Sequence, residues 1–297
     1  MKVYSMLNDL AFQWIFNQPG REKILMSLLN AILHLENEDR ISEIVYLNPL
    51  NPASRQEGKK SVVDIKVRDQ KGSWYEVEAQ VYEHPGYIER TAYYIAKLYS
   101  DQADKGQKYI DLTPAIGISI LNFRLFKEST KVQETFEFRN VDSSLVLLNT
   151  MSLHYIDLIN FNRKKPAELQ TPFEKWLHLM KFSKAYARMR VDAATIFPGE
   201  EELNMALSEH LRLNADDEMR IRMEQEERAR LDEIFLRSYS LKRGREQGRA
   251  EGRVEGRAEG IAQVALNLLQ MGMTVEKVSE ATGLNLEQIN QLLTYKK

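Results

Sequence analysis

Residues 61–82 read SVVDIKVRDQKGSWYEVEAQVY, and this segment has the clearest structural pattern in the chain. Apolar and polar residues alternate in SVVDIKVRD and again in WYEVEAQV, which is the pattern of two β-strands that each bury one face. The intervening QKG, residues 70–72, suits a three-residue hairpin loop with glycine in the left-handed conformation at its last position. The sequence therefore predicts a β-hairpin.

The loop fixes which residues of the two strands face each other. If Asp69 faces Ser73 across the loop, one face of the hairpin becomes entirely apolar. The other face then carries three pairs: Lys66 with Glu76, Asp64 with Glu78, and Val62 with Gln80. A shift by one residue would mix the two faces, so the alternation supports this register.

The polar face has the residues for metal chemistry. Asp64 and Glu78 would be cross-strand neighbours whose Cβ atoms lie about 5 Å apart. Two ionised carboxylates this close repel each other unless a cation lies between them, and magnesium suits such a position because it takes oxygen ligands and keeps several waters. Gln80 follows on the same face, where its amide can orient a water. From alternation alone, a solvated acidic strand face is the alternative.

The patterns on either side of the hairpin predict an α/β fold. Helices are predicted over residues 3–16, 21–35 and 87–103. The third of these is expected to bury Ile88, Ala92, Ile95, Ala96 and Tyr99. Further strands are predicted over residues 114–123, 134–139, 144–149 and 153–161. Helices followed by a mixed sheet with a crossover helix indicate a layered α/β architecture.

The character of the chain changes near residue 171. Long, charged helical patterns cover residues 172–190 and 200–243, and glycine then recurs at every fourth position. We therefore divide the chain into a core of residues 1–165, a helical extension of 166–243, a Gly/Arg/Glu repeat of 244–260 and a small helical unit of 261–297 that resembles a helix-turn-helix.

The Gly/Arg/Glu repeat has two interpretations. On a helix, its arginines and its glutamates form two like-charged rows at four-residue spacing, which destabilise an isolated helix. The repeat is therefore either a flexible linker or a paired helix. A parallel two-fold pair would set the arginine row of one chain against the glutamate row of the other, which predicts a homodimer. The charges of residues 261–297 cancel, whereas readers of the DNA major groove usually need basic phosphate anchors. The unit therefore has two interpretations, DNA reading or a protein-interaction or capping role.

Composition limits the class of protein. The 297 residues carry a formal net charge of −2, so any contact with nucleic acid must come from local basic patches. The absence of cysteine excludes disulfides, zinc–cysteine sites and thiol nucleophiles. The N-terminal residues mix charged and polar residues into their apolar run, unlike a signal peptide, and no apolar run approaches the roughly 18 residues of a membrane span. We expect a cytoplasmic protein without a membrane segment.

The motifs resemble those of the recombination-promoting nuclease and transposase family, which belongs to the PD-(D/E)XK nuclease superfamily. The resemblance rests on D-x13-E-x-Q, formed by Asp64, Glu78 and Gln80, and on the R-x2-YY that begins at Arg90. Residues 9–16, 27–33, 88–109 and 117–123 extend it, so that it covers nearly the whole chain.

The resemblance implies a restriction-endonuclease-like core, a mixed sheet flanked by helices. It implies that Asp64 and Glu78 bind Mg²⁺ or another divalent cation, together with the carbonyl of Ala79. Gln80 stands where the superfamily has lysine, which limits this residue to orienting water because glutamine is neither a cation nor a general base. Arg90 and Tyr94 match the helix that follows the active strands.

We therefore expect a magnesium-dependent endonuclease that cuts double-stranded DNA, linked to recombination or mobile DNA, with Asp64, Glu78 and Gln80 as catalytic residues. Lys97 shares a helix side with Arg90 and Tyr94, and the three are candidate DNA contacts, although Arg90 could instead form a structural pair with an acid. Cutting both strands implies a dimer. The alternative is a catalytically weak nuclease fold that assembles partners or regulates DNA through its helical tail.

Overall fold

The computed structural model describes residues 2–47, 65–103, 108–143, 145–147 and 150–294. They form two compact units, Met1–Glu227 and Arg228–Lys297. The first unit contains the sheet and is built on the predicted hairpin. In the described part of the chain, we find no helix with the length and apolar character that crossing a membrane demands.

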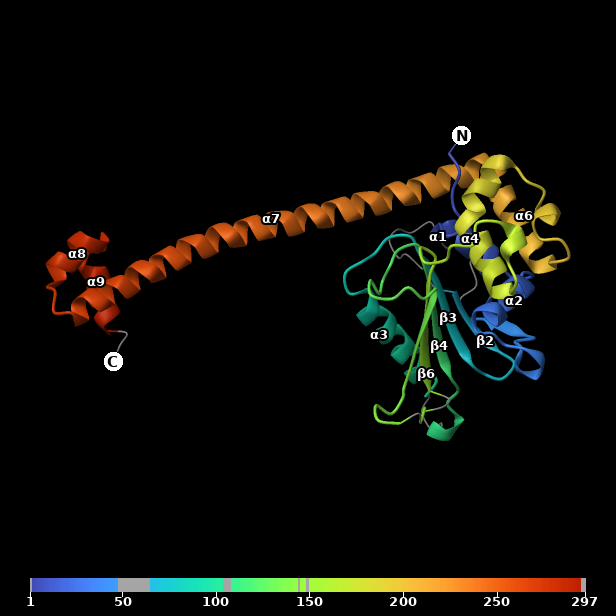
Figure 1. The fold of residues 1–297 in the computed structure, drawn as a ribbon, viewed down its shortest axis with the longest axis horizontal. Helices are drawn as coiled ribbons and strands as arrows, with labels where there is room; N and C mark the ends of the chain where they lie inside the picture. Colours follow the sequence, from blue (N-terminus) through green and yellow to red (C-terminus); the bar gives the residue numbers. More distant parts are fainter. Residues whose placement is uncertain (1, 48–64, 104–107, 144, 148–149, 295–297) are drawn as a thin grey trace. The chain divides into compact units, whose positions relative to one another are not determined.

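A mixed sheet of six described strands lies at the centre of the first unit, in the order β1-β2-β3-β4-β6-β5 (Figure 1). The strands are β1 (Ile44–Tyr46), β2 (Ile65–Asp69), β3 (Trp74–Gln80), β4 (Ala115–Leu121), β5 (Gln133–Glu137) and β6 (Met151–Asp157). The three central strands β3, β4 and β6 are parallel, and the outer pairs are antiparallel. The α/β fold with a mixed sheet is confirmed.

The hairpin has the predicted register wherever the structure describes it. Lys66 pairs with Glu76, the backbone N–H of Asp69 donates to the carbonyl of Ser73 at 3.0 Å, and Gly72 has a φ of +88°. The expected partners at positions 62 and 64 lie outside the described residues. The alternation and the loop together were therefore sufficient to place Glu76 correctly.

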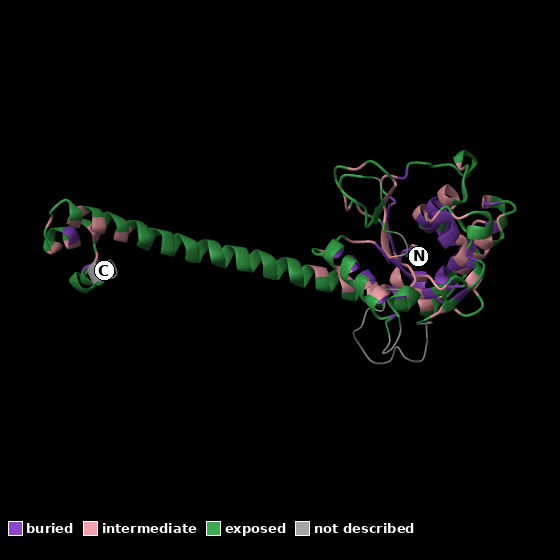
Figure 2. Ribbon diagram, turned by 90° about the horizontal axis from the view of Figure 1, so that it is seen from below, coloured by how far each residue is buried: buried purple, intermediate pink, exposed green. Residues whose placement is uncertain are grey.

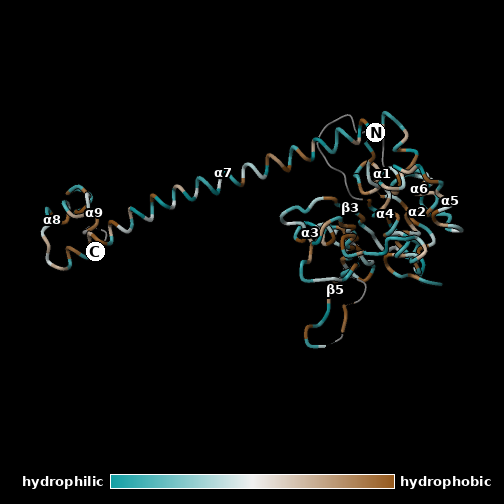
Figure 3. The backbone as a smooth tube through the Cα atoms, turned by 45° about the horizontal axis from the view of Figure 1, so that its top comes forward, coloured by the Kyte–Doolittle hydropathy of each residue, from teal (hydrophilic) through white to brown (hydrophobic). Residues whose placement is uncertain are grey.

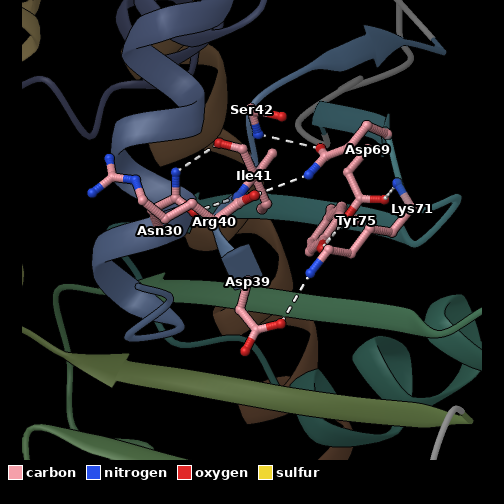
Figure 4. Close-up of polar contacts among 9 residues, drawn as sticks. Asn30, Asp39, Arg40, Ile41, Ser42, Asp69, Lys71 and Tyr75 are labelled. Carbon is pink, nitrogen blue, oxygen red and sulfur yellow. Dashed lines mark hydrogen bonds and ion pairs between the residues drawn. The ribbon is translucent and has the colours of Figure 1, made fainter. Parts of the chain in front are cut away.

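Side chains at the turn fasten the hairpin to the segment between α2 (Glu22–Ile32) and β1 (Figure 4). The Asp69 carboxylate accepts hydrogen bonds from the backbone N–H groups of Lys71 and Ser73, at 2.9 and 2.8 Å, and from the Tyr75 hydroxyl at 2.7 Å. Lys71 in turn pairs with Asp39 at 3.0 Å. These contacts fix the turn end of β3.

Helices cover both faces of the sheet (Figure 1). The main apolar core lies between one face and α1 (Asp9–Phe16), α2, α4 (Pro172–Met189) and α6 (Glu201–Ala215), while α3 (Tyr87–Ser100) covers the other face. Trp176 of α4 is fully buried in that core, and its indole N–H donates to the Ser27 hydroxyl at 3.2 Å. The boundary predicted at residue 165 therefore falls inside one compact unit, because α4 and α6 complete the core that α1 and α2 begin.

Shorter helices join these elements: η1 (Asn37–Asp39), η3 (Tyr109–Asp111), η4 (Pro166–Glu168) and α5 (Ala193–Ile196).

The buried side of α3 differs from the predicted one. Ile95 is buried as expected, but Ile88, Ala92 and Ala96 are exposed. The residues that α3 buries are Tyr87, Thr91, Ile95 and Leu98. Tyr87 and Thr91 reach the polar groups of Glu78 and Tyr155 on the sheet, whereas Ile95 and Leu98 pack around Ala115.

The second unit is helical. Helix α7 (Asp217–Gln270) begins in the first unit and contains the whole Gly/Arg/Glu repeat, and residues 241–260 are exposed throughout (Figure 2). The end of α7 packs with α8 (Val275–Thr282) and α9 (Leu286–Thr294) around Ala265, Val278 and Ile289. The predicted capping of the last helix is present: Asn285 and Gln288 exchange side-chain-to-backbone hydrogen bonds at 2.9 and 2.8 Å.

We expect buried His210 on α6 to make the first unit sensitive to acid. Its ring lies 3.0 Å from the carbonyl of Tyr4, and burial lowers its pKa from 6.5 to about 4. Because the folded pKa lies below the unfolded one, the stabilisation is complete above pH 6.5 and is lost as the pH falls towards 4. We expect the free energy of unfolding of His210→Gln to fall less steeply over this window in urea titrations. An unchanged slope would contradict the assignment to His210.

Candidate active site

The polar face of β3 lies under α3. The three side chains that point to this face, Glu76, Glu78 and Gln80, are only 6%, 5% and 2% exposed. The predicted acidic face is therefore not a solvated strand surface in the described residues. These side chains also lie opposite the main apolar core, which takes Val77 and Ala79 of the same strand.

Polar groups surround the carboxylate of Glu78. The Tyr87 hydroxyl donates to Oε1, and the Ser119 hydroxyl lies 3.4 Å from the same oxygen. Arg90 Nη2 lies 3.2 Å from Oε2, and the Gln80 amide nitrogen lies 3.4 Å from it. A buried carboxylate is costly without such partners, so these four groups offset the cost of burying Glu78.

Tyr87 is the first residue of α3, and its hydroxyl is directed at Glu78. Burial, followed by the neighbouring Glu78 charge, raises the pKa of the Tyr87 phenol well above its ordinary value. The phenol therefore stays protonated and acts as a donor. The Arg90 guanidinium lies 5.0 Å from the centre of the Tyr87 ring, which holds both partners of Glu78 together.

The parallel register brings polar residues from neighbouring strands into line with Glu78. Glu78 pairs with Ser119 on β4, and Ser119 pairs with Tyr155 on β6. The Tyr155 hydroxyl lies 2.6 Å from the Thr91 hydroxyl of α3. These hydroxyl contacts explain why α3 turns its Tyr87–Thr91 side to the sheet.

The backbone of β3 directs the carbonyl of Ala79 away from β4. The Trp74 N–H donates to the Pro114 carbonyl, and the Gln80 carbonyl accepts from the Asn122 N–H, so both groups point to the β4 side. Backbone groups alternate along a strand, and Ala79 therefore faces the β2 side. This carbonyl is therefore oriented toward groups on the β2 side of β3, beyond the described Ile65–Val77 pair.

A family model described as PD-(D/E)XK nuclease family transposase matches residues 6–239. The chain belongs to this family. Searches of curated proteins and of solved structures found no match. Membership supports a nuclease- or transposase-type function with DNA as the substrate, and nucleases of the PD-(D/E)XK class generally use divalent metals.

The described donors at the end of β3 fit such a metal in chemical type. The Glu78 carboxylate and the Ala79 carbonyl are both oxygen donors, which magnesium prefers. The described residues contain no group of three or more histidine, aspartate or glutamate side chains suited to a metal ion. Asp64, the second predicted carboxylate, lies outside the described residues.

The predicted DNA contacts lie on α3 in three different settings. Arg90 is paired with Glu78, and Tyr94 is half-buried with its ring 5.8 Å from that of Tyr93. Lys97 is exposed and pairs with Asp101 at 3.0 Å. The structure therefore brings Arg90 and Gln80 to Glu78 but leaves Lys97 at the surface.

Two partners of Glu78 were absent from the sequence-based site, Tyr87 and Ser119. Ser119 is the single hydroxyl in the apolar run of β4, and that interruption was its only signal. Tyr87 could have been noticed because it follows the Pro85-Gly86 pair at the start of the predicted helix. Gly86, with a φ of +76°, directs the chain into α3 at this point.

Proposed function

We propose that this protein is a magnesium-dependent DNA endonuclease that hydrolyses phosphodiester bonds and serves recombination or mobile DNA. The observation that carries the proposal is the buried Glu78 carboxylate, held by Tyr87 and Arg90 on the core of a nuclease family. An ionised carboxylate is expensive to bury in a structural position. A ligand that needs the charge explains better why the carboxylate is buried beside Tyr87, Arg90 and Ser119.

Each candidate residue has a definable role. Asp64, Glu78 and the Ala79 carbonyl would hold the magnesium ion, which when bound polarises the phosphate and activates a water. Gln80 lies beside Glu78 and can donate and accept hydrogen bonds, so it is suited to orienting that water. Tyr87 and Arg90 hold Glu78 in a fixed position. We also propose that Arg90, Tyr94 and Lys97 present the DNA-contacting side of α3.

Plasmid nicking tests the proposal. Wild-type protein is expected to nick supercoiled plasmid with Mg²⁺ and to lose this activity with EDTA. The Asp64→Ala variant is expected to be inactive under both conditions. Equal nicking by the wild type and Asp64→Ala would sink the assignment of Asp64 and would point to a contaminating nuclease.

One observation favours a second candidate, a catalytically weak scaffold that binds DNA or protein partners. Gln80 occupies the place of a lysine and supplies no positive charge near the phosphate. The Gln80→Lys variant separates the two candidates. A weak but genuine nuclease should gain activity, whereas a scaffold should show no magnesium-dependent nicking with either residue.

We further propose that the protein is a homodimer paired through the repeat in α7. The repeat glycines have no heavy atom near an added Cβ, so a second helix could approach them closely. The cysteine-free chain allows a direct test by single substitutions. Gly252→Cys should form an intermolecular disulfide, which needs Cβ atoms about 4 Å apart, while Ala250→Cys, on the opposite side of the helix, should not. A dimer without the Gly252→Cys crosslink would exclude the parallel pair.

A further inference from the structure

The loop between β4 and β5 combines cations with aromatic rings. Residues 122–132 read NFRLFKESTKV, with Phe123 and Phe126 partly buried. Arg124, Lys127 and Lys131 are all exposed, and Glu128 is the one acid of the segment. Among the described residues, Arg124 and Lys127 have no ion-pair partner, and Lys131 lies 3.6 Å from Glu134. This basic charge stands out in a chain whose net charge is −2.

The loop begins beside the candidate active site. The Asn122 N–H donates to the carbonyl of Gln80 at 2.8 Å, so the chain leaves β4 directly next to the end of β3. This is the edge where the parallel strands β3 and β4 end. In open α/β sheets, ligands bind beyond the carboxyl ends of such strands.

A continuous series of aromatic contacts links the site to the edge of the sheet. The Tyr87 ring, whose hydroxyl binds Glu78, lies 6.0 Å from Phe123 and 6.5 Å from Tyr155. Tyr155 lies 5.4 Å from Phe126 and 5.8 Å from Phe136 of β5. Phe136 is 46% exposed although its ring is large and apolar.

All of these rings lie on the face that carries Glu78. The register runs from Glu78 through Ser119 and Tyr155 to Glu134 on the edge strand β5. Phe136 lies two residues after Glu134 and therefore shares this face. Three strand spacings of about 4.8 Å place that edge roughly 14 Å from Glu78. Figure 3 shows β5 at the start of a hairpin that projects from the sheet. A nucleic acid strand that passes Glu78 can therefore reach Phe136 within a few nucleotides.

We propose that Arg124, Lys127, Phe126 and Phe136, the loop surface, bind a single-stranded segment of the DNA substrate. The cations contact its phosphates, and an unpaired base stacks on the exposed Phe136 ring. Exposed aromatic rings beside unpaired cations are the combination that single-strand binding uses. The bases of a duplex are stacked on one another and offer no free face to Phe136. The inference deepens the proposed nuclease function by naming a substrate class, DNA with an unpaired strand near the cut.

Binding measured without cleavage tests the inference. Full-length protein in EDTA is titrated against a fluorescein-labelled single-stranded oligodeoxynucleotide and against its duplex, with anisotropy as the readout. Phe136→Ala should weaken single-strand binding about tenfold and duplex binding much less, and Phe136→Tyr should restore it. The control Tyr109→Ala removes a ring that is 85% exposed elsewhere in the unit and should have no effect.

Substitution of the two cations of the loop surface tests their contact with the DNA phosphates. Arg124→Gln with Lys127→Gln should weaken single-strand binding and reduce the salt dependence of log Kd by about 0.7 for each cation. Lys184→Gln, an exposed cation on α4 across the sheet from α3, should leave both unchanged. Unchanged single-strand binding in the loop-surface variants overturns the inference. So does an equal loss for both DNA forms with Phe136→Ala, or a change in oligomeric state with unchanged DNA binding.

These outcomes are separate from those of the nicking assay. If the wild type nicks plasmid with magnesium, but the wild type and Phe136→Ala bind single strands equally well, the proposed nuclease function stands and the inference about the loop surface is wrong. If Phe136→Ala loses single-strand binding, but the wild type never nicks plasmid, the inference about the loop surface stands and the proposed nuclease function is wrong.

Discussion

Glu78→Gln is expected to lower magnesium-dependent DNA cleavage about a hundred- to a thousandfold. The amide keeps the size of the side chain but removes the negative charge that a cation requires. The fold should persist, because the loss affects one hydrogen-bonded group and costs about 1–3 kcal/mol. Initial nicking rates at saturating magnesium, with far-UV circular dichroism as a check on folding, measure both effects.

Glu76→Gln is the matched control for this variant. Glu76 lies on the same strand and face, is 6% exposed, and is 3.8 Å from Lys66 rather than beside Tyr87 and Arg90. We expect its cleavage rate to stay within a fewfold of the wild type. If both variants lost activity equally, buried charge on β3 would be needed for structure, and Glu78 would have no special role.

The hairpin could be predicted from the sequence because its information is local. The alternation of Ile65, Val67, Tyr75 and Val77 defines the apolar face, and the loop ending at Gly72 fixes the register. The same two facts placed Glu78 and Gln80 together on the other face. Nothing beyond the two strands and their turn was required.

The surroundings of Glu78 could not be predicted in the same way. Ser119 reaches Glu78 only through the parallel pairing of β3 with β4, which are joined by a long crossover that contains α3. No local pattern fixes the register of such a pair. The orientation of α3 followed from the same register, since Thr91 faces Tyr155 of β6. The predicted stripe contains Ile95 but is otherwise displaced by about one residue, because periodicity alone could not show that Tyr87 and Thr91 have polar partners in the sheet.

The role of the helix after residue 165 could not be predicted either, because the sequence of a charged amphipathic helix does not show which element covers its apolar side. The α4 sequence has low overall hydrophobicity, yet Trp176, Leu177, Leu179 and Met180 are fully buried against the N-terminal helices. The pattern of charges suggested an extension. The contacts instead make α4 part of the structure that supports the sheet.

Trp176→Ala is accordingly expected to lower the free energy of unfolding of the first unit by about 3–5 kcal/mol. The indole is fully buried, lies 5.9 Å from the Phe16 ring and donates to Ser27 on α2. Urea unfolding followed by far-UV circular dichroism gives the value. Tyr109→Ala removes a ring that is 85% exposed and should change the free energy by less than about 0.5 kcal/mol.

The number of steps in the urea unfolding transition is a more discriminating test than the free energy alone. If residues 172–215 complete one core with α1 and α2, the whole sheet should unfold with α4, and Trp176→Ala should move a single transition for the first unit to lower urea. If those residues formed a separate extension, the variant would lose its helical signal early while the sheet unfolded at the wild-type concentration. Nicking activity would then survive the early loss, because β3 and α3 would still hold Glu78 in place.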